Sequence, residues 1–185
     1  MEETNKPNQG WELFRFAVIA FFVILFTRLF IAQPFIVSGP SMSPTFENAD
    51  YLIIDEISYY LNEPKRYDVV VFRYPKDTKK FFIKRIIGLP NEVLEIEGSK
   101  VTVINSEYPQ GLTLDDSFVE NKSENSMSIK LREDEYFVMG DNRSASSDSR
   151  YWGPVTRNLV VGKAFARLWP IKNMEIYPGK FIPNN

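Results

Sequence analysis

DVVVFRYPKDTKKFFIKRII, residues 68–87, decides the fold class of this 185-residue chain. Its first part, 68–74, and its last part, 81–87, are rich in β-branched and aromatic residues, which favour strands. The residues between them include Pro75-Lys76-Asp77-Thr78, which is typical of a turn. The sequence therefore predicts two strands that pair with each other across this turn.

The pattern extends the predicted sheet in both directions. Further extended segments are expected at 33–37, 51–54, 93–96, 100–104, 135–139 and 160–169. Nothing from Tyr51 onward shows sustained helical periodicity, and the polar stretch 105–125 is typical of a surface insertion. We therefore expect a mainly β, antiparallel domain over residues 32–185.

A long apolar segment precedes this domain. Residues 13–31 are interrupted only by Arg15, Thr27 and Arg28. About 19 helical residues at ~1.5 Å each span roughly 28 Å, close to the hydrocarbon thickness of a bilayer. A cleaved signal peptide and a buried core helix are the alternatives. The apolar core is long for the first, and the absence of a polar face argues against the second. The sequence predicts a transmembrane anchor.

The orientation of this anchor follows from the basic residues around it. Lys6 and Arg15 lie on its amino side, whereas no Lys or Arg follows Arg28 until Lys65. Basic residues favour the cytoplasmic side of a membrane. We expect 1–12 to be a cytoplasmic tail and 32–185 to lie outside the cytoplasm.

Composition excludes several classes of site. The chain has no histidine and no cysteine, so a Ser-His-Asp triad, a histidine-ligated zinc site and a disulfide are all impossible. The formal net charge of −2 gives no general basicity that would favour nucleic acid. A serine nucleophile in this chain would need a lysine or a carboxylate as its base.

A candidate nucleophile lies in the stretch 38–46, SGPSMSPTF, shortly after the apolar segment. Gly39 permits backbone angles that are closed to other residues, while Pro40 and Pro44 fix theirs. Ser41, between the two prolines, could be held in one pose with its hydroxyl presented. The alternative is that this stretch is an ordinary loop.

Lys84 is the candidate base, because it lies within an apolar strand. A lysine surrounded by apolar groups loses hydration of its charged form, so its pKa falls. The neutral amine could then take a proton from a serine hydroxyl. The alternative is that Lys84 is a charge on an edge strand that prevents aggregation.

A third stretch, 140–150, follows an apolar strand and reads GDNRSASSDSR. Its carboxylates, Asp141 and Asp148, could pair with Arg85, Arg143 or Arg150 and fix a loop beside a catalytic centre. The alternative is a solvated loop, in which such pairs contribute little. Two aspartates seven residues apart without a histidine are weak evidence for a metal site, so we expect no metal and no cofactor.

Together these stretches resemble the type I signal peptidases, the bacterial leader peptidases of family S26 that use a Ser/Lys dyad. The nucleophile box of that family resembles 41–45, its strand box 68–72, its lysine box 84–90 and its last box 140–150. The resemblance covers about 11–170. Asn91 and Tyr67 stand at two turn positions where the family often has glycine.

The resemblance implies a role for each site residue. Ser41 would be the nucleophile, Lys84 the general base, and Ser146 the hydroxyl that hydrogen-bonds the Lys84 amine. The pairs Asp141–Arg85 and Asp148–Arg150 would be structural supports. The Ser41 backbone N–H would hold the oxyanion. A second donor, which some relatives place two residues before the nucleophile, is missing at Gly39 or supplied differently, and Ser38, one residue further away, could be a substitute.

The resemblance also implies a membrane-bound endopeptidase that removes signal peptides from exported preproteins at Ala-x-Ala sites. The substrate would lie extended between the strand before Ser41 and the strand of Lys84. Its small side chains would enter pockets lined by Phe35, Val37, Met42, Val71, Phe82 and Ile83. The expected partners are preprotein signal peptides, membrane lipid and the secretion translocon, at a bacterial cell membrane. A self-cleaving Ser/Lys protease of the repressor type and an inactive membrane-tethered binding module are the alternatives.

Overall fold

The computed structural model describes residues 9–30, 32–98, 100–124 and 126–183, without the side chains of 25–30 and 32. One long helix, α1 (Gln9–Phe30), precedes the β domain, and two short helices, α2 (Ser58–Leu61) and α3 (Ser149–Trp152), lie within it. The described strands are β1 (Ala32–Ile36), β2 (Tyr51–Asp55), β3 (Val69–Tyr74), β4 (Asp77–Gly88), β5 (Val93–Glu97), β6 (Lys100–Ile104), β7 (Leu112–Thr113), β8 (Ser126–Lys130), β9 (Glu135–Met139), β10 (Val155–Thr156), β11 (Val160–Trp169) and β12 (Glu175–Ile176).

The larger sheet has the order β1-β2-β11-β3-β4-β9-β10, and β12 pairs with β11. All of its recorded pairings are antiparallel. Strands β1 and β4 are separated by three others in this order, yet the rings of Phe35 on β1 and Phe81 on β4 have centroids 5.4 Å apart. The sheet therefore curls, so that β1 faces β4 across a gap.

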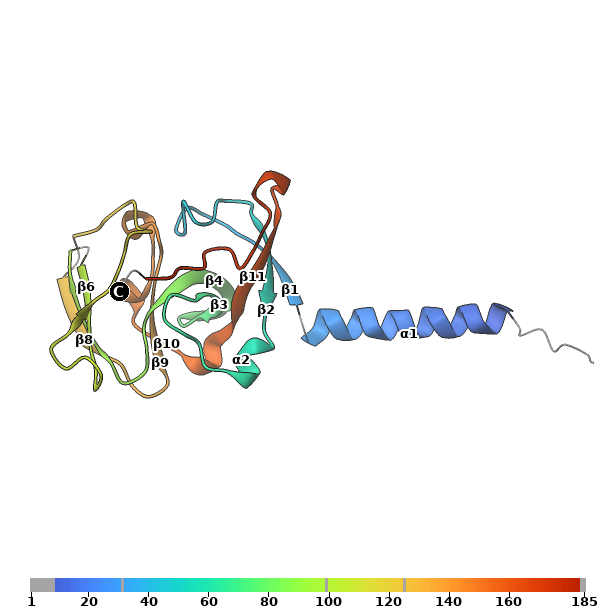
Figure 1. Cartoon of the computed structure of the whole chain (residues 1–185), viewed down its shortest axis with the longest axis horizontal. Coiled ribbons are helices and arrows are strands. Elements are labelled where there is room, and N and C mark those ends of the chain that lie inside the picture. Colours follow the sequence, from blue (N-terminus) through green and yellow to red (C-terminus); the bar gives the residue numbers. More distant parts are fainter. Residues whose placement is uncertain (1–8, 31, 99, 125, 184–185) are drawn as a thin grey trace, which may run out of the picture.

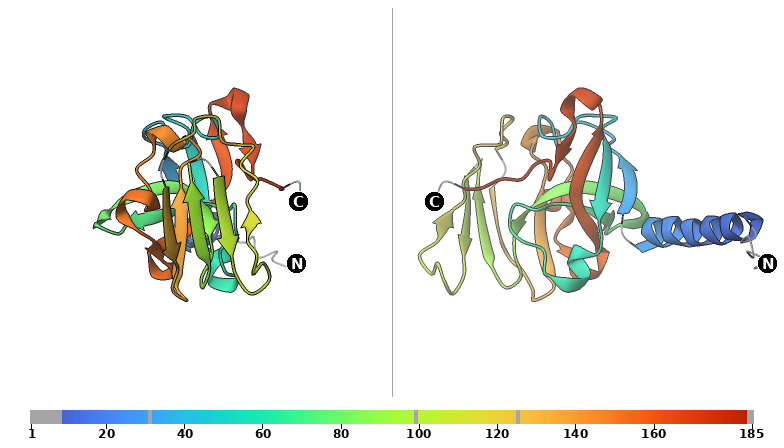
Figure 2. Two further views of the ribbon diagram at one scale, coloured as in Figure 1. Left: turned by 90° about the vertical axis from the view of Figure 1, so that its left-hand side faces the viewer. Right: turned by 45° about the vertical axis from the view of Figure 1, so that its right-hand side comes forward.

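The smaller sheet has the order β7-β6-β5-β8 and lies at the end of the domain farthest from α1 (Figures 1 and 2). One apolar core joins it to the larger sheet. Leu94 and Val103 of the small sheet belong to the same buried cluster as Ile87 and Phe137 of the large one. The domain is therefore mainly β and antiparallel, which confirms the predicted fold class.

The hairpin of β3 and β4 is the one predicted from residues 68–87. Its register pairs Val70 with Lys84 and Phe72 with Phe82. Strand β4 begins earlier than expected, at Asp77, so the turn itself is shorter than predicted. The second half of β4 is buried, and there β9 pairs with its other edge, with Ile86 opposite Val138.

The segment 105–125, expected as a polar surface insertion, also contributes to the core. Strand β7 within it pairs with β6, and the side chains of Leu114 and Val119 are buried. Asn125 lies outside the described residues. The two turn positions without glycine, Tyr67 and Asn91, have φ values of 69° and 66°, in the left-handed region that glycine favours.

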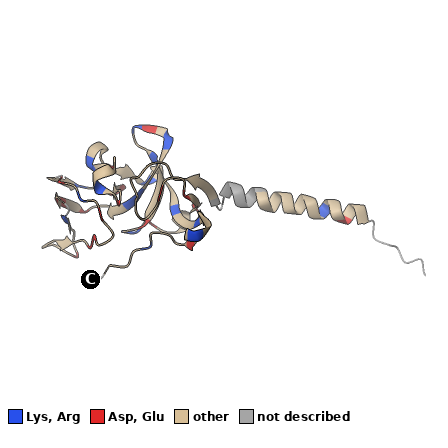
Figure 3. Cartoon of the chain, turned by 90° about the horizontal axis from the view of Figure 1, so that it is seen from above, with Lys and Arg blue, Asp and Glu red and all other residues tan. Residues whose placement is uncertain are grey.

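Helix α1 covers most of the expected anchor and projects away from the β domain (Figures 1 and 2). Its described part carries two charged side chains, Glu12 and Arg15 (Figure 3). Within the part of the chain that the structure describes, no helix is long and apolar enough to cross a membrane. The transmembrane anchor at 13–31 is therefore not confirmed, and Ile31 and the tail residues 1–8 lie outside the description.

Candidate active site

Ser41 lies in the loop 37–50, between β1 and β2. Backbone bonds close the base of this loop, from the Val37 N–H to the Asp50 carbonyl (2.9 Å) and from the Ala49 N–H to the Val37 carbonyl (2.9 Å). Gly39 adopts a φ of 91°, and its N–H donates to Asn48 Oδ1 at 3.0 Å. The loop is therefore held on both sides of Ser41.

The structure brings Lys84 to this loop. Lys84 Nζ lies 2.7 Å from Ser41 Oγ and donates a second bond to the Ile83 carbonyl at 2.8 Å. The lysine is only 4% exposed, and loss of hydration lowers its pKa from 10.5 to about 8. The negative charges of Asp148 and Asp141 act in the opposite direction. A substantial fraction of Lys84 is therefore neutral near pH 8.

Asp141 connects the loop of Ser41 with β4, the strand of Lys84. Its carboxylate accepts two bonds from the Arg85 guanidinium, at 2.8 and 2.6 Å, and one from Thr45 Oγ1 at 2.6 Å. Both members of this ion pair are buried. The neighbouring Asn142 N–H donates to the Ser41 carbonyl at 3.1 Å. Asp141 and Asn142 thus fasten the loop of Ser41 to the strand of Lys84.

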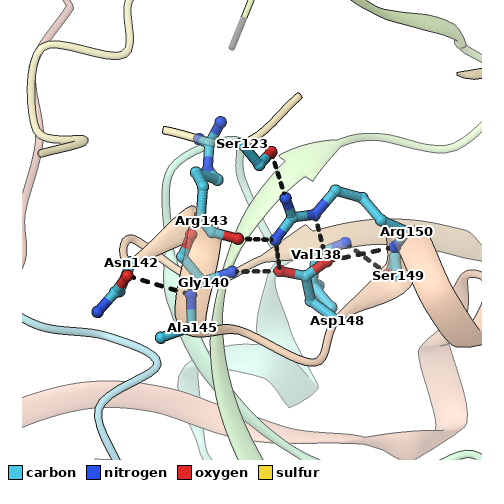
Figure 4. A network of polar contacts seen from close by, with 9 residues as sticks. All are labelled: Ser123, Val138, Gly140, Asn142, Arg143, Ala145, Asp148, Ser149 and Arg150. Atoms are coloured by element: carbon cyan, nitrogen blue, oxygen red, sulfur yellow. Dashed lines mark hydrogen bonds and ion pairs between the residues drawn. The ribbon is translucent and has the colours of Figure 1, made fainter. Parts of the chain in front are cut away.

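Asp148 organises the rest of the loop 140–150 (Figure 4). It accepts bonds from Arg150 Nε at 2.7 Å and from the Gly140 N–H at 3.0 Å. Arg150 also donates to Ser123 Oγ and to the Arg143 carbonyl, each at 2.7 Å. This loop is therefore a bonded network that reaches into the segment 105–125, and not a solvated loop.

Ser146 requires a correction. The expected hydrogen bond between its hydroxyl and Lys84 is absent, and Ser146 Oγ is buried with no hydrogen-bond partner among the described residues. Ser146 Oγ does lie beside the nucleophile loop, because a Cβ built at Gly140 would overlap both this oxygen and the Ser41 carbonyl oxygen. The amine of Lys84 turns instead to Ser41 and to the Ile83 carbonyl.

A cavity of about 500 Å³ opens at Ser41 and Lys84, between β1 and β4. Five of the six predicted substrate-pocket residues line it: Phe35, Val37, Val71, Phe82 and Ile83. Met42 does not, because its side chain is fully buried in the apolar core beneath the loop. The methionine that follows the half-buried Ser41 turns to the opposite side of the loop, which the sequence did not indicate.

Sequence reasoning missed several residues that line the cavity. They are Ile36, Leu52, Lys80, Phe81 and Ser147. Ser147 belongs to the loop 140–150, so its presence near the nucleophile could have been inferred from that motif. Leu52 could not, because it lines the cavity through the pairing of β1 with β2, in which it lies opposite Phe35, and the sequence did not specify that register.

One donor for a developing oxyanion is present. Among the described residues, the Ser41 backbone N–H has no recorded partner, so it is free to donate to a ligand. Gly39 and Ser38 also line the cavity, but the Gly39 N–H is already bonded to Asn48. No group of three or more carboxylates that could hold a metal occurs in the described part of the chain.

The sequence of the chain matches a known protein family. Residues 10–169 match the sequence profile described as "Signal peptidase, peptidase S26". The chain is 37% identical to a "Probable signal peptidase I-2" of Synechocystis sp., over 95% of this chain and 84% of that protein. It is 35% identical to a "Signal peptidase I" of Bacillus caldolyticus, over 92% of this chain and 96% of that protein.

A solved structure of a signal peptidase I from Enterococcus faecalis V583 is 28% identical, with a TM-score of 0.46, over 55% of this chain and 97% of that chain. The assignment is drawn from the sequence matches, which span most of the chain and most of both relatives. The chain therefore belongs to the signal peptidase family, peptidase S26, whose members are serine-type hydrolases.

Proposed function

We propose that this member of the signal peptidase family is a membrane-bound endopeptidase that cuts signal peptides from exported preproteins with Ser41 as nucleophile and Lys84 as general base. The observation that carries the proposal is the 2.7 Å contact between Lys84 Nζ and Ser41 Oγ, made by a lysine that is 4% exposed. Burial favours the neutral amine, and only the neutral amine can accept the hydroxyl proton.

Acylation begins when neutral Lys84 removes the proton of Ser41 Oγ as this oxygen attacks the scissile carbonyl carbon. The carbonyl oxygen becomes an oxyanion, which the Ser41 backbone N–H stabilises by donation. The ammonium of Lys84 then protonates the leaving amine, so that the C–N bond breaks and the signal peptide remains as an ester on Ser41.

Deacylation returns the enzyme to its starting state. Lys84, neutral again, takes a proton from water while the water oxygen attacks the ester carbon. The Ser41 oxygen leaves and recovers a proton from Lys84. No metal or organic cofactor takes part in either half of this sequence.

The free strand edges support an extended substrate. β1 pairs only with β2 among the described strands, and the recorded partners of β4 up to Lys84 lie on β3 alone. An added strand could bond to these edges through its backbone. Its alternate side chains would enter the cavity that Phe35, Val71 and Ile83 line, where close apolar walls favour alanine-sized groups at the first and third positions before the cut.

We extend the proposal to attachment at a bacterial cytoplasmic membrane, with α1 as a single-pass anchor, the amino terminus inside and the β domain outside. The described side chains of α1 support it, because large apolar groups such as Phe14, Phe16 and Phe22 are exposed. The last residue of β11, Trp169, and Ile171 just after that strand are also exposed. Signal peptides and membrane lipid would then be the partners, together with the secretion translocon.

The attachment is tested by alkaline carbonate extraction of membranes from cells that express the full chain. An integral anchor keeps the protein in the membrane pellet, whereas peripheral binding releases it into the supernatant. Release into the supernatant would remove the single-pass anchor from the proposal and leave the dyad chemistry untouched.

The catalytic proposal is tested with a synthetic preprotein that carries an Ala-x-Ala site, in detergent or lipid. Wild type should cut after the second alanine, and Ser41→Ala and Lys84→Ala should each lose about 100-fold or more of the rate. Lys79→Ala is the matched control, because Lys79 is an exposed lysine on the same strand. Retained cutting by Lys84→Ala would identify a different base.

The inactive binding module makes the opposite prediction. Under that alternative, folded wild type, Ser41→Ala and Lys84→Ala would all leave the preprotein intact and bind it equally well. A Ser41→Ala variant that still performs the cellular role of the wild type would also favour the binding module.

A further inference from the structure

The segment Tyr177–Phe181, here called the C-terminal strap, lies beyond the residues 10–169 that match the family profile. It follows β12 and runs back across the domain toward the smaller sheet (Figures 1 and 2). The Tyr177 N–H donates to the Phe165 carbonyl at 2.7 Å, and the Lys180 N–H donates to the Tyr177 carbonyl at 3.1 Å. The strap is therefore a turn fixed to β11.

The strap makes a direct bond to the neighbour of Lys84. Arg85 Nη1 donates to the Gly179 carbonyl at 2.6 Å and to the Tyr67 carbonyl at 3.0 Å, while Nε and Nη2 hold Asp141. The guanidinium is thus fixed from three directions by one carboxylate and two carbonyls. Arg85 is only 1% exposed, so its guanidinium depends on these protein groups for its hydrogen bonds.

Gly179 fits this place because it has no side chain. Its φ is 75°, and an added Cβ would lie 2.9 Å from Thr45 Cγ2 and 3.1 Å from both Phe46 Cε2 and Val69 Cγ2. Thr45 is the residue whose hydroxyl donates to Asp141. The strap therefore packs directly on the group that joins the nucleophile loop to the Arg85–Asp141 pair.

Phe181 packs against the aromatic rings beside the Arg85 guanidinium. Its ring centroid lies 4.9 Å from that of Tyr67 and 4.8 Å from that of Phe118. The Arg85 guanidinium carbon lies 4.4 Å from the centroid of the Phe118 ring. Phe181 therefore supports the ring on which the guanidinium stacks, and it does so from a part of the chain far from β4 in sequence.

We infer that the C-terminal strap is a positioning element of the active site, which holds Arg85 on Asp141 and thereby fixes Lys84 beside Ser41. The inference rests on the proposed function of the dyad. The strap does not line the substrate cavity, so it acts on the reacting groups and not on substrate binding.

Because charged groups surround Lys84, its pKa reports whether Arg85 stays on Asp141. Asp148 and Asp141 of the loop 140–150 raise the pKa of Lys84, and each carboxylate is ion-paired, Asp141 with Arg85 and Asp148 with Arg150. Arg143, also buried in this loop, is a third cation. If the strap loosens, Arg85 moves from Asp141, the carboxylate acts more strongly on Lys84, and the pKa of Lys84 rises.

The first test is Gly179→Ala with Gly98→Ala as the matched control. Gly98 has a φ of 60°, so alanine is strained there too, but the nearest atom to its added Cβ is 3.8 Å away. For Gly179→Ala we expect kcat to fall about 10-fold or more with KM within about twofold, because a small displacement of reacting groups is costly. Gly98→Ala should match wild type in both.

The pH–rate profile separates positioning from a general loss of structure. The acidic limb of kcat should move to higher pH by about half a unit or more in Gly179→Ala, since Lys84 must be deprotonated to act. A fall in kcat without this movement would overturn the inference, and so would an unchanged kcat in a variant that retains the fold.

Phe181 provides a second variant series in case Gly179→Ala does not fold. Phe181→Ala should lower kcat and move the acidic limb of the pH–rate profile to higher pH. Phe181→Leu should bring both kcat and the acidic limb most of the way back to wild type. Ile182→Ala should change neither, because Ile182 is 72% exposed. Equal behaviour of Phe181→Ala and Ile182→Ala would overturn the inference.

A measurement without substrate keeps the inference separate from the proposed function. NMR titration of the Lys84 side chain should give a higher pKa in Phe181→Ala than in wild type. If wild type fails to cut any preprotein, the proposed function fails, while this titration still decides whether the strap controls Lys84. An unchanged pKa would contradict the role of the strap.

Discussion

At the scale of the residue, Lys84 is a buried cation that the fold holds at a cost. The folded chain binds the Lys84 proton up to about pH 8, whereas the unfolded chain, with an ordinary pKa of 10.5, binds it to higher pH. That difference corresponds to about 3 kcal/mol, a large part of the stability of an ordinary domain. The activity of the dyad and the stability of the fold therefore oppose each other at this position.

We predict that Lys84→Met raises the free energy of unfolding by about 3 kcal/mol at pH 7, while it abolishes cleavage. Between pH 8 and 10.5 the unfolded wild type binds more protons than the folded one, so wild-type stability rises with pH in that window. The advantage of Lys84→Met should shrink accordingly. Denaturant unfolding of both proteins from pH 7 to 10 checks this, and a difference independent of pH would contradict it.

Single residues show where sequence reasoning succeeds and where it ends. The stretches 38–46 and 81–87 pointed to Ser41 and Lys84, and the fold brings these two side chains into contact. Met42 lies in the first of these stretches and Ser146 in the stretch 140–150, yet the Met42 side chain is buried in the core and Ser146 Oγ makes no hydrogen bond. A motif predicts the neighbourhood of a side chain, whereas its direction depends on backbone angles that the motif does not specify.

At the scale of the element, the loop 140–150 approaches the nucleophile loop more closely than a side chain would permit. The Asn142 N–H bonds to the Ser41 carbonyl, and Gly140 lies against that same carbonyl oxygen. Two loops that meet backbone to backbone fix each other without depending on flexible side chains. The position of Ser41 thus depends on a glycine about a hundred residues away along the chain.

We predict that Gly140→Ala lowers kcat/KM by about 100-fold, because the new methyl group would displace either Ser146 or the Ser41 loop. Gly153→Ala is the control, since its added Cβ meets nothing within 4 Å even though its φ of 91° makes alanine strained. Steady-state cleavage assays compare the two. Equal losses would contradict the prediction, because they would show that the close approach at Gly140 has no special effect.

Strands with strong alternation or apolar runs were predicted close to their observed bounds. Strand β9 and strand β11 begin and end where the sequence placed them. Strand β8 was missed although its sequence SMSIK alternates polar and apolar residues, as a half-exposed strand does. Strands β7, β10 and β12 were missed because two residues carry no detectable pattern. These strands owe their conformation to the partners beside them.

At the scale of the whole molecule, the two sheets share a core, but only the larger one carries the dyad. Leu94 lies in that core, fully buried, at the junction where it packs against Gly88. The apolar contacts of the smaller sheet therefore contribute to the stability of the whole domain, while its strands lie away from the cavity.

We predict that Leu94→Ala lowers the free energy of unfolding by about 2–5 kcal/mol, the usual cost of a cavity at a buried leucine. Because no residue of β5 lines the substrate cavity, kcat at 25 °C should stay within about twofold of wild type. Denaturant unfolding and cleavage assays of the same preparation check both. A parallel loss of kcat would show that the smaller sheet also shapes the site.

The order of the strands is the part of the fold that the sequence could not predict. Hairpins such as β3–β4 and β5–β6 follow from local turns. The insertion of β11 between β2 and β3, by contrast, joins segments about a hundred residues apart. Such pairings depend on matching whole surfaces, which no short pattern encodes.

The place of β11 has a consequence for how the protein is made. Ser41 and Lys84 leave the ribosome early, but the strand that lies between their halves of the sheet, β11, ends only at Trp169. Until that strand has been synthesised, β2 and β3 have no common partner and the two reacting groups have no fixed separation. We therefore expect a nascent chain that stops short of β11 to be unable to cut, because the dyad is assembled only after that strand has been synthesised.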